Sequence, residues 1–202
     1  STRMLQHELA TPIAMAQTAL ELLAAGDDPA MTERLTTMAL RSLQLAGRLL
    51  ESWGRARDLQ SGGVGVELAW TQIDLSELVR ECVADVDALR FDHHEYSVDV
   101  ERSVTLPADP DAVRQILFNL LTNAAKFSPD GSRIEVSLTA TADRAVVAVR
   151  DRGPGLAPRD TERIFEAGQR LDPSAPGMGL GLFVARRLAR AHGGELHVEE
   201  AP

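Results

Sequence analysis

The sequence predicts an all-α helical hairpin followed by an α+β domain. Residues 1–61 repeat apolar side chains at steps of three and four, which is the periodicity of amphipathic helices. Residues 66–202 instead combine short alternating stretches, typical of strands, with further helical ones. The glycines of Ser61–Gly65 separate the two patterns and are typical of a flexible linker. We therefore expect two domains, 1–61 and 66–202.

Composition and charge exclude several classes of protein. The chain has 202 residues, of which 44% are hydrophobic, so it can build one large or two small cores. Its net charge of -9 argues against a nucleic-acid partner, and its single cysteine, Cys82, cannot form an internal disulfide. No apolar run approaches the roughly 18 residues that a membrane helix needs. We expect no membrane span in this stretch and a cytoplasmic location for it. The helical pattern already under way at Ser1 indicates a piece of a longer protein, which could itself be membrane-anchored.

The first helix carries its apolar residues on one stripe, which consists of Met4, Leu5, Leu9, Ile13, Ala16, Leu20 and Leu23. Pro12 lies inside this helix and is expected to bend it about one turn after His7, because proline removes a backbone hydrogen bond. The Ala25–Pro29 stretch is expected to end the helix, with Gly26 as C-cap and Asp28 as N-cap of the next helix.

The second helix has two adjacent apolar stripes. The first consists of Met31, Leu35, Met38, Ser42, Leu45, Leu49, Ser52, Ala56 and Leu59. The second consists of Ala39, Leu43, Ala46, Leu50 and Trp53. One stripe would suffice for the partner within a hairpin, whereas two make an apolar face too wide for it. We therefore expect a homodimer in which two hairpins form a four-helix bundle.

A histidine with polar neighbours lies near the start of the first helix. His7 falls off the apolar stripe, so its imidazole should face solvent. An imidazole is a nucleophile near neutral pH, and the adjacent Glu8 could accept or orient its ring proton. Thr11, four residues on, lies on the same helical face and could position a water. An ordinary surface histidine is the alternative interpretation.

The second domain begins with short elements. Leu68–Ile73 and Tyr96–Val100 alternate as strands do, and Asp74–Glu77 offers cap residues for a helix between them. The His93–His94 pair has no further metal ligands nearby and is expected to lie in a solvated loop.

A third helix is predicted over Asp109–Phe127, with apolar positions at Val113, Leu117, Leu120, Ala124 and Phe127. Asn119, Asn123 and Lys126 are spaced by four and three, which places them together on one flank. An amide oxygen suits Mg²⁺ and an ammonium group suits phosphate. Lys126 is also the only lysine among the 21 basic residues. A polar outer face of the helix is the alternative interpretation.

Two strands of a hairpin are predicted over Arg133–Ala140 and Arg144–Arg150. The second strand runs into Asp151, which is followed by Gly153 and Gly155. A carboxylate at a strand end can accept a hydrogen bond from the exocyclic amine of adenine, while glycine lets the backbone approach the base. The same pattern also fits an ordinary turn.

The last part of the chain holds a second glycine-rich motif. Phe165 precedes a loop, Ala167–Pro176, that is rich in glycine, proline and polar residues. The Gly177–Leu182 run then opens a helix through about His192, and glycines before a helix can present N–H groups to phosphate. No strand immediately precedes these glycines and no P-loop lysine follows them, so the motif is neither a Rossmann fingerprint nor a P-loop. A final strand is predicted over Glu195–Glu199.

Together these motifs resemble a known family. Asn-x-x-x-Asn-x-x-Lys, Asp-x-Gly-x-Gly, a Phe motif and Gly-x-Gly-x-Gly occur in the order found in the catalytic domain of sensor histidine kinases. The His7–Pro12 hexapeptide similarly resembles the family's phosphoacceptor signature, His-Glu-Leu-x-Thr-Pro, with Ala10 in place of a common arginine. The resemblance covers about residues 66–200 as well as the hairpin. It implies a two-layer α+β sandwich, shared with gyrase and a heat-shock chaperone, that binds ATP and Mg²⁺.

The resemblance also implies which residues bind the nucleotide. They are Asn119, Asn123, Lys126, Asp151, Gly153, Gly155, Phe165, Arg170, Gly177, Gly179, Leu180 and Gly181. Among them Asn123 would be the metal ligand, while Lys126 and Arg170 would contact phosphate. Asp151 would bind adenine, and Phe165 would anchor a mobile lid.

The reaction implied by the resemblance is autophosphorylation. His7 would accept the γ-phosphate of ATP, with Glu8 assisting proton handling. The phosphate would then pass to an aspartate in the receiver domain of a response regulator. Thr11 would serve the reverse activity by orienting water against the phosphorylated regulator.

Two other functions stay open at this point. Gly168 stands where many relatives carry a second aromatic residue, and Met178 where many carry a small hydroxyl residue. These departures keep a non-catalytic dimeric scaffold as an alternative. An ATP-hydrolysing clamp fits less well, because Asn119 stands where such clamps have a glutamate and because the histidine helix is present.

Overall fold

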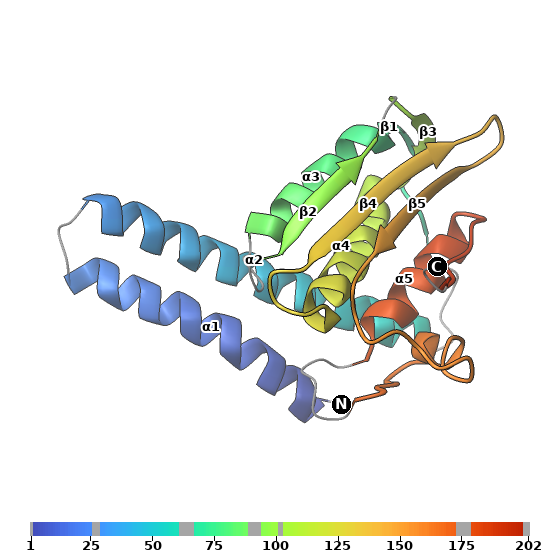
Figure 1. Cartoon of the computed structure of the whole chain (residues 1–202). Coiled ribbons are helices and arrows are strands. Elements are labelled where there is room, and N and C mark those ends of the chain that lie inside the picture. Colours follow the sequence, from blue (N-terminus) through green and yellow to red (C-terminus); the bar gives the residue numbers. More distant parts are fainter. Residues whose placement is uncertain are drawn as a thin grey trace.

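The computed structural model describes residues 2–25, 29–60, 67–88, 94–100, 103–172 and 179–199, and it gives only the backbone for some residues of the first two helices. A long helical hairpin leads into an α/β part (Figure 1). The elements are α1 Thr2–Ala25, α2 Pro29–Gln60, β1 Thr71–Asp74, α3 Leu75–Ala88, β2 Glu95–Asp99, β3 Thr105–Ala108, α4 Pro110–Phe127, β4 Arg133–Ala140, β5 Ala145–Arg150, the 3-10 helix η1 Arg163–Phe165 and α5 Gly181–Ala191. The predicted linker at Ser61–Gly65 and the caps at Gly26 and Asp28 lie outside the described residues.

The hairpin is closed by a narrow seam of mostly small side chains. Ala19 of α1 packs with Leu35 and Ala39 of α2, and all three are buried. Many larger apolar side chains of the two helices are about half exposed, namely Ile13, Met15, Leu20, Leu22, Met31, Leu40, Leu43 and Leu50. The single chain therefore leaves part of the predicted apolar stripes uncovered. Helix α1 runs without interruption through Pro12, whose side chain is buried.

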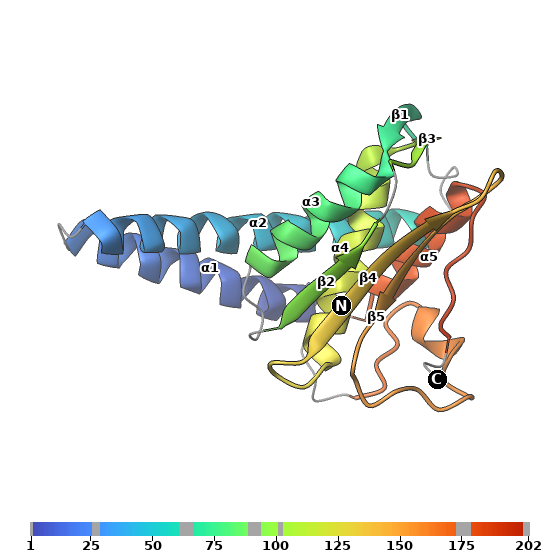
Figure 2. The ribbon, with the colours of Figure 1, turned by 45° about the horizontal axis from the view of Figure 1, so that its top comes forward.

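Two separate sheets form the α/β part. In the three-stranded sheet, β2 is parallel to β4 and β4 is antiparallel to β5. The antiparallel pair confirms the hairpin that was predicted over Arg133–Ala140 and Arg144–Arg150. Strands β1 and β3 form a two-stranded antiparallel sheet of their own. Helices α3 and α4 cover one face of the larger sheet (Figure 1 and Figure 2), so this part has an α+β architecture with a layer of helices on a layer of strands.

The main core lies between those two layers. It is built from one face of α3, one face of α4 and the inward-facing residues of the sheet, and its most buried side chains include Val79, Cys82, Leu121, Ile134 and Val136. Helix α4 begins where the sequence predicts, because the Asp109 carboxylate accepts hydrogen bonds from the backbone N–H groups of Asp111 and Ala112. The start and the direction of α4 are thereby set by local chemistry.

The entry strand begins later than its alternation predicts. The structure has β1 at Thr71–Asp74 rather than Leu68–Ile73. The reason is that the Ala69 N–H donates to the Asp109 carboxylate at 2.9 Å, while Leu68 packs on a small cluster formed by α4 and α5. These contacts hold the residues before Thr71 away from a strand partner.

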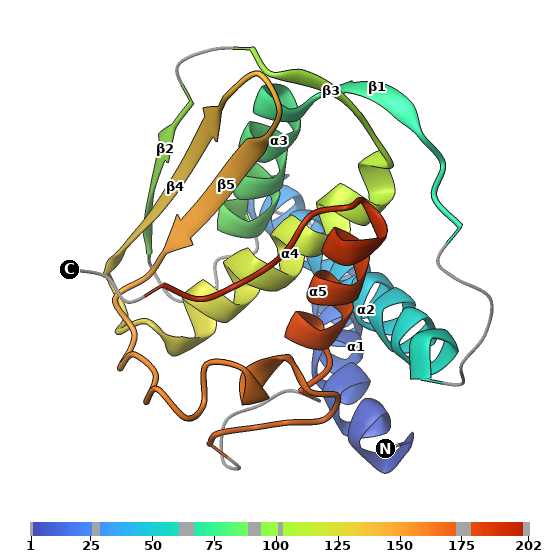
Figure 3. The same ribbon diagram turned by 90° about the vertical axis from the view of Figure 1, so that its right-hand side faces the viewer.

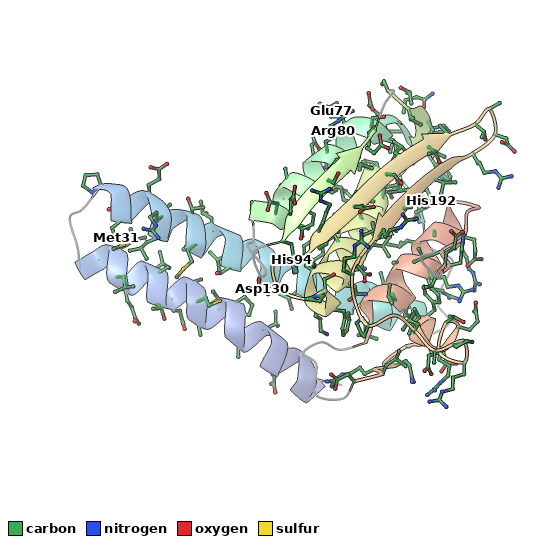
Figure 4. The ribbon with its side chains drawn as sticks, in the orientation of Figure 1. Met31, Glu77, Arg80, His94, Asp130 and His192 are labelled. Atoms are coloured by element: carbon green, nitrogen blue, oxygen red, sulfur yellow. The ribbon has the colours of Figure 1, made fainter. Side chains whose placement is uncertain are left out.

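The prediction that the His93–His94 pair is exposed to solvent is wrong for His94. The His94 side chain is only 8% exposed, and its Nε2 donates to the Ala125 carbonyl oxygen of α4 at 2.8 Å (Figure 4). A buried imidazole that satisfies a carbonyl near the end of a helix is part of the packing rather than a solvated group. His93 lies outside the described residues.

The strand predicted over Glu195–Glu199 is wrong, since the structure describes these residues as an irregular segment after α5. The carboxylate of Glu195 bonds to Arg186 Nε at 2.8 Å and to Arg190 Nε at 3.0 Å. These ion pairs hold the beginning of the segment beside α5. Its alternating pattern therefore has no strand to pair with among the described residues.

None of the helices in the described part of the chain is both long and apolar enough to cross a membrane.

Candidate functional site

The site predicted from the sequence is built around one flank of α4. Asn119 is 6% exposed, whereas Asn123 and Lys126 are half-buried further along the same helix. The Asn119 Nδ2 donates to the carbonyl oxygen of Gly181 at 3.0 Å, and its Oδ1 accepts from Gln115 Nε2 at 3.2 Å. Asn119 therefore ties α4 to the first residue of α5, 62 positions later in the chain.

Helix α5 is fastened to α4 near both of its ends (Figure 3). At its start, a Cβ on Gly181 would lie 3.4 Å from Asn119 Oδ1, at van der Waals contact, so the two residues pack directly against each other. At its end, the Asp109 N–H donates to His192 Nε2 at 3.1 Å, while His192 Nδ1 donates to the Leu188 carbonyl oxygen at 2.8 Å (Figure 4). The position of the α5 N-terminus relative to the α4 flank is thus determined by hydrogen bonds at two points.

The N-terminus of α5 offers backbone N–H groups beside that flank. Its N-cap, Leu180, makes no side-chain cap bond, and its side chain packs on the cluster of Ala112, Val184 and Leu188. The Leu180 side chain is half-buried in this cluster, and its backbone lies at the helix start. Unpaired N–H groups and the positive end of the helix dipole favour an anion at this position.

Gly179 brings two distant parts of the chain into contact just before α5. Its φ is +66°, and its carbonyl oxygen accepts a hydrogen bond from the Gly168 N–H at 3.0 Å. A Cβ at this position would lie 2.5 Å from the Gln169 carbonyl oxygen, closer than real atoms approach. Glycine is therefore required here for both conformation and space. Gly177 lies outside the described residues.

The Asp151–Gly155 turn lies at the other end of the α4 flank. The Asp151 side chain is exposed, and its Oδ1 accepts from the Gly153 N–H at 2.7 Å. A Cβ on Gly153 would lie 2.8 Å from that side-chain oxygen and 3.1 Å from the Phe127 carbonyl oxygen, so a larger residue would require the Asp151 side chain to move and the turn to shift slightly from the end of α4. Gly155 follows with a φ of +72°. The turn also contacts Ser128, whose Oγ accepts from the Arg152 N–H at 3.3 Å.

Phe165 lies apart from the α4 flank, in η1. It is 6% exposed and is covered by the guanidinium group of Arg186 from α5, 4.5 Å from the ring centroid. Arg170, between Phe165 and Gly179, is half-buried.

The histidine predicted to react lies in α1. The backbone of His7, Glu8 and Thr11 is helical, as predicted, and their side chains lie outside the described part of the structure. Of the residues predicted for the nucleotide, the structure thus places Asn119 against Gly181 and the Asp151 turn against the end of the same helix.

Comparison with known proteins identifies the family. A family model for the histidine kinase-, DNA gyrase B-, and HSP90-like ATPases matches residues 108–202. The adaptive-response sensory kinase SasA of a Synechococcus species is 32% identical over 98% of this chain and 54% of the relative. The solved structure of the mycobacterial sensor histidine kinase MprB is 32% identical, with a TM-score of 0.58 over 64% of this chain and 84% of that one. This chain belongs to the sensor histidine kinases.

The relatives that establish the family are named as kinases. The structure of full-length ShkA, solved in complex with AMPPNP, is 25% identical with a TM-score of 0.66, and the match covers 99% of this chain and 43% of ShkA. A second SasA, from Crocosphaera subtropica, is 32% identical over 98% of this chain and 55% of the relative. The chain spans about half the length of the curated relatives it matches.

Sequence reasoning missed two residues of the candidate site. Spacing places Phe127 on the apolar stripe of α4, but its side chain is 43% exposed, and its ring centroid lies 4.7 Å from the Lys126 ammonium group. It is exposed because it is the last residue of the helix, where the stripe has turned past the core. Gln115 was not singled out, although a glutamine four residues before Asn119 is a helix-compatible hydrogen-bond pair that the spacing itself suggests.

The donor set of the candidate site is compatible with magnesium shared with substrate phosphates, rather than with a metal held by protein alone. Within the described residues no group of three or more His, Cys, Asp or Glu side chains could hold a metal ion. Asn119 Oδ1 already accepts from Gln115, and the half-buried Asn123 offers a second amide oxygen on this flank. Mg²⁺ commonly binds through one or two protein oxygens, substrate phosphates and water, so this sparse set is compatible with it.

Proposed function

We propose that this chain is the kinase core of a two-component sensor, which phosphorylates His7 from ATP and passes the phosphate to a response regulator. Residues 1–61 would be the dimerisation and histidine phosphotransfer domain and residues 66–202 the catalytic and ATP-binding domain. The observation that carries the proposal is the α4 flank, which has the N-terminus of α5 at one end and the Asp151 turn at the other.

The arrangement supports an extended nucleotide along α4. Between Asn119 and Phe127 the helix rises by roughly 12 Å. The Asp151 carboxylate at one end would accept the exocyclic amine of adenine, and the exposed Phe127 ring next to it offers an apolar surface to the base. At the other end, the backbone N–H groups at the start of α5 would attract the phosphates. Lys126 precedes Phe127, with its ammonium group 4.7 Å from the centroid of that ring, and its long side chain would extend along the flank toward the phosphates.

Magnesium would be held by Asn123 together with the phosphates of the nucleotide. When bound, Mg²⁺ offsets negative charge on the phosphate oxygens. The protein's own contribution on this flank is to keep the half-buried Asn123 and Lys126 in line with Asn119, which is immobilised by its two hydrogen bonds.

Phosphoryl transfer would use the ring of His7 as the nucleophile. A ring nitrogen forms a bond to the γ-phosphorus while the bond from that phosphorus to the bridging oxygen breaks, and the electron pair leaves with ADP. Glu8 would accept or orient the proton on the other ring nitrogen. The phosphoryl group would then move to an aspartate of a receiver domain, and Thr11 would orient water for hydrolysis of that phosphoaspartate.

The hairpin supports a homodimer. Eight large apolar side chains of α1 and α2, from Ile13 to Leu50, are between 41% and 57% exposed. Exposed apolar surface of that extent along a rod is typical of an interface, and the occupant we propose is a second copy of the same hairpin. Light scattering should therefore give twice the mass of one chain, and Leu20→Glu combined with Leu43→Glu should give the mass of one chain.

Labelling with γ-labelled ATP and Mg²⁺ tests the kinase reaction. The wild-type chain should acquire an acid-labile, alkali-stable label that His7→Gln and Asn123→Ala both abolish. His197→Gln is the matched control, since His197 is an exposed histidine after α5 that pairs with Glu199. Label that persists in His7→Gln would contradict the assignment of the phosphoacceptor.

The same assay separates the two alternatives. Consumption of ATP without labelling of the protein would favour a hydrolysing clamp. Failure to bind nucleotide at all would favour a non-catalytic scaffold. Transfer of label to a purified receiver domain, and its loss from that domain in a Thr11-dependent manner, would test the later steps.

A further inference from the structure

Arg186 of α5 contacts three side chains from two other segments of the chain. Its guanidinium group covers the Phe165 ring, with Cζ 4.5 Å from the ring centroid. Its Nη1 donates to Glu162 Oε2 at 2.7 Å, and its Nε donates to Glu195 Oε1 at 2.8 Å. The side chain is only 14% exposed, although it carries a charge. Few arginines are held this closely unless their position matters to the packing.

The contacts of Arg186 join α5 to the segment that contains Glu162 and Phe165. Arg186 lies on α5, five residues after Gly181, whose carbonyl oxygen is bonded to Asn119. Glu162 and Phe165 belong to the segment that continues to Gly168, and the Gly168 N–H bonds to Gly179 immediately before α5. Arg186 therefore fastens this segment to the same helix whose N-terminus faces the α4 flank.

For the packing of Arg186, the planar shape of its guanidinium group matters more than its charge. Glu162 is 74% exposed, and an ion pair with so exposed a carboxylate adds little stability by itself. A guanidinium group, however, is planar and presents donors in a rigid fork, so it can lie flat on Phe165 while directing two N–H groups to different carboxylates. Neither lysine nor an apolar side chain can make all three contacts.

We propose that Arg186 is a positioning residue for nucleotide binding, which holds the 162–168 segment against α5 in the arrangement that the phosphate end of the site requires. It acts through Phe165 and the Gly168–Gly179 contact and does not touch the nucleotide. The inference rests on the proposed function in one respect, namely that the start of α5 is where phosphate binds. Without Arg186 the arrangement that binds nucleotide becomes a minor population, and the apparent affinity for nucleotide falls in proportion to that population.

Arg186→Met tests this proposal, with Arg190→Met as the matched control. Arg190 lies one turn further along α5 and bonds to the same carboxylate, Glu195, at 3.0 Å. Within the described residues it has no ion pair or ring contact with Glu162 or Phe165. Both variants therefore remove one arginine from the same helix and the same ion-pair group.

The expected result is a change in affinity without a matching change in turnover. Arg186→Met should weaken binding of AMPPNP with Mg²⁺ about tenfold, the effect of losing a stacked cation and its ion pairs, and leave kcat at saturating ATP within about twofold. Arg190→Met should change the affinity less than about twofold. Arg186→Lys, which keeps the charge but not the fork, should lie between wild type and Arg186→Met.

Hydrogen exchange provides a readout that does not depend on nucleotide. The amides of Ile164, Phe165 and Glu166 donate to the carbonyl oxygens of Asp160, Glu162 and Arg163. They should exchange faster in Arg186→Met than in Arg190→Met, because only the first variant loosens this segment. Glu162→Gln, which leaves α5 intact, should weaken AMPPNP binding in the same direction by about two- to threefold.

The outcomes distinguish the inference from the proposed function. If wild type binds AMPPNP and Arg186→Met binds it equally well, or if both arginine variants lose affinity equally, the inference is wrong and the proposed function stands. If wild type does not bind AMPPNP, the proposed function is wrong and the inference falls with it. Slower exchange or unchanged exchange at Phe165 in Arg186→Met would also overturn the positioning role.

Discussion

Replacement of Gly179 by alanine tests the close approach of backbone at the start of α5. Gly179 has a φ of +66°, and an L-residue in that region loses about 1 to 2 kcal/mol. The new Cβ would also lie 2.5 Å from the Gln169 carbonyl oxygen and 2.8 Å from the Gly168 carbonyl carbon. Because both are backbone atoms, relief requires a shift of the chain, which costs about 1 to 3 kcal/mol more. The total expected loss is about 2 to 5 kcal/mol.

Gly168→Ala is the control for conformational strain alone. Gly168 has a φ of +77°, but a Cβ there would meet nothing within 4 Å. Its loss should be about 1 to 2 kcal/mol, so the difference between the two variants measures the steric contact at Gly179. Calorimetry is a suitable assay, since each kcal/mol corresponds to about 2 to 4 °C in Tm for a chain of this size.

The consequence for function follows from the position of Gly179. A shift of its backbone moves the beginning of α5, where the N–H groups are proposed to bind phosphate, so Gly179→Ala should weaken AMPPNP binding more than Gly168→Ala does. Equal losses of stability in the two variants would refute the steric reasoning. Tighter or unchanged AMPPNP binding in Gly179→Ala would refute the link to the phosphate end of the site.

Two further outcomes are expected away from the site. The Tyr96 hydroxyl is buried and has no hydrogen-bond partner among the described residues, so Tyr96→Phe should stabilise the chain by about 1 kcal/mol in urea unfolding, and a loss of stability would contradict this. Burial also raises the pKa of Tyr96 from 10.0 to about 12, because it disfavours the ionised form, so the stability of the chain does not depend on this group below pH 10 and falls as the pH rises through 12, a loss absent from Tyr96→Phe. The Arg190 and Arg186 guanidinium groups lower the pKa of Glu195 from 4.5 to about 2, so this carboxylate's contribution is present above pH 4.5 and is lost as the pH falls through 2. An NMR titration of Arg190→Met should give Glu195 a higher pKa, and an unchanged value would assign the shift to another cause.

Elements with strong local signals were predicted well from the sequence. Helix α4 has an Asp109 cap and a sustained apolar stripe, and strands β4 and β5 alternate cleanly, so their bounds agree closely with the structure. Each of these signals is contained within the element itself, which is why no knowledge of the rest of the fold was needed.

Errors arose where a distant contact overrode the local pattern. The alternation of Glu195–Glu199 predicted a strand, but ion pairs to α5 hold its first residue at the helix. His94 was expected in solvent and is instead buried against Ala125, 31 residues away in the chain. Local periodicity contains no information about such partners, because they are chosen when the elements pack.

The sequence by itself determined the order of the motifs and the residues that share a helix flank, and hence the family and the residues proposed to bind ATP. Side-chain spacing along a helix follows from its 3.6-residue period, so Asn119, Asn123 and Lys126 could be grouped without coordinates. Only the tertiary structure decided that Asn119 bonds to Gly181, that Gly153 fits against the end of α4, and that Arg186 lies on Phe165. Those contacts join residues from different elements, and their geometry depends on the packing of α4, α5 and the sheet as a whole.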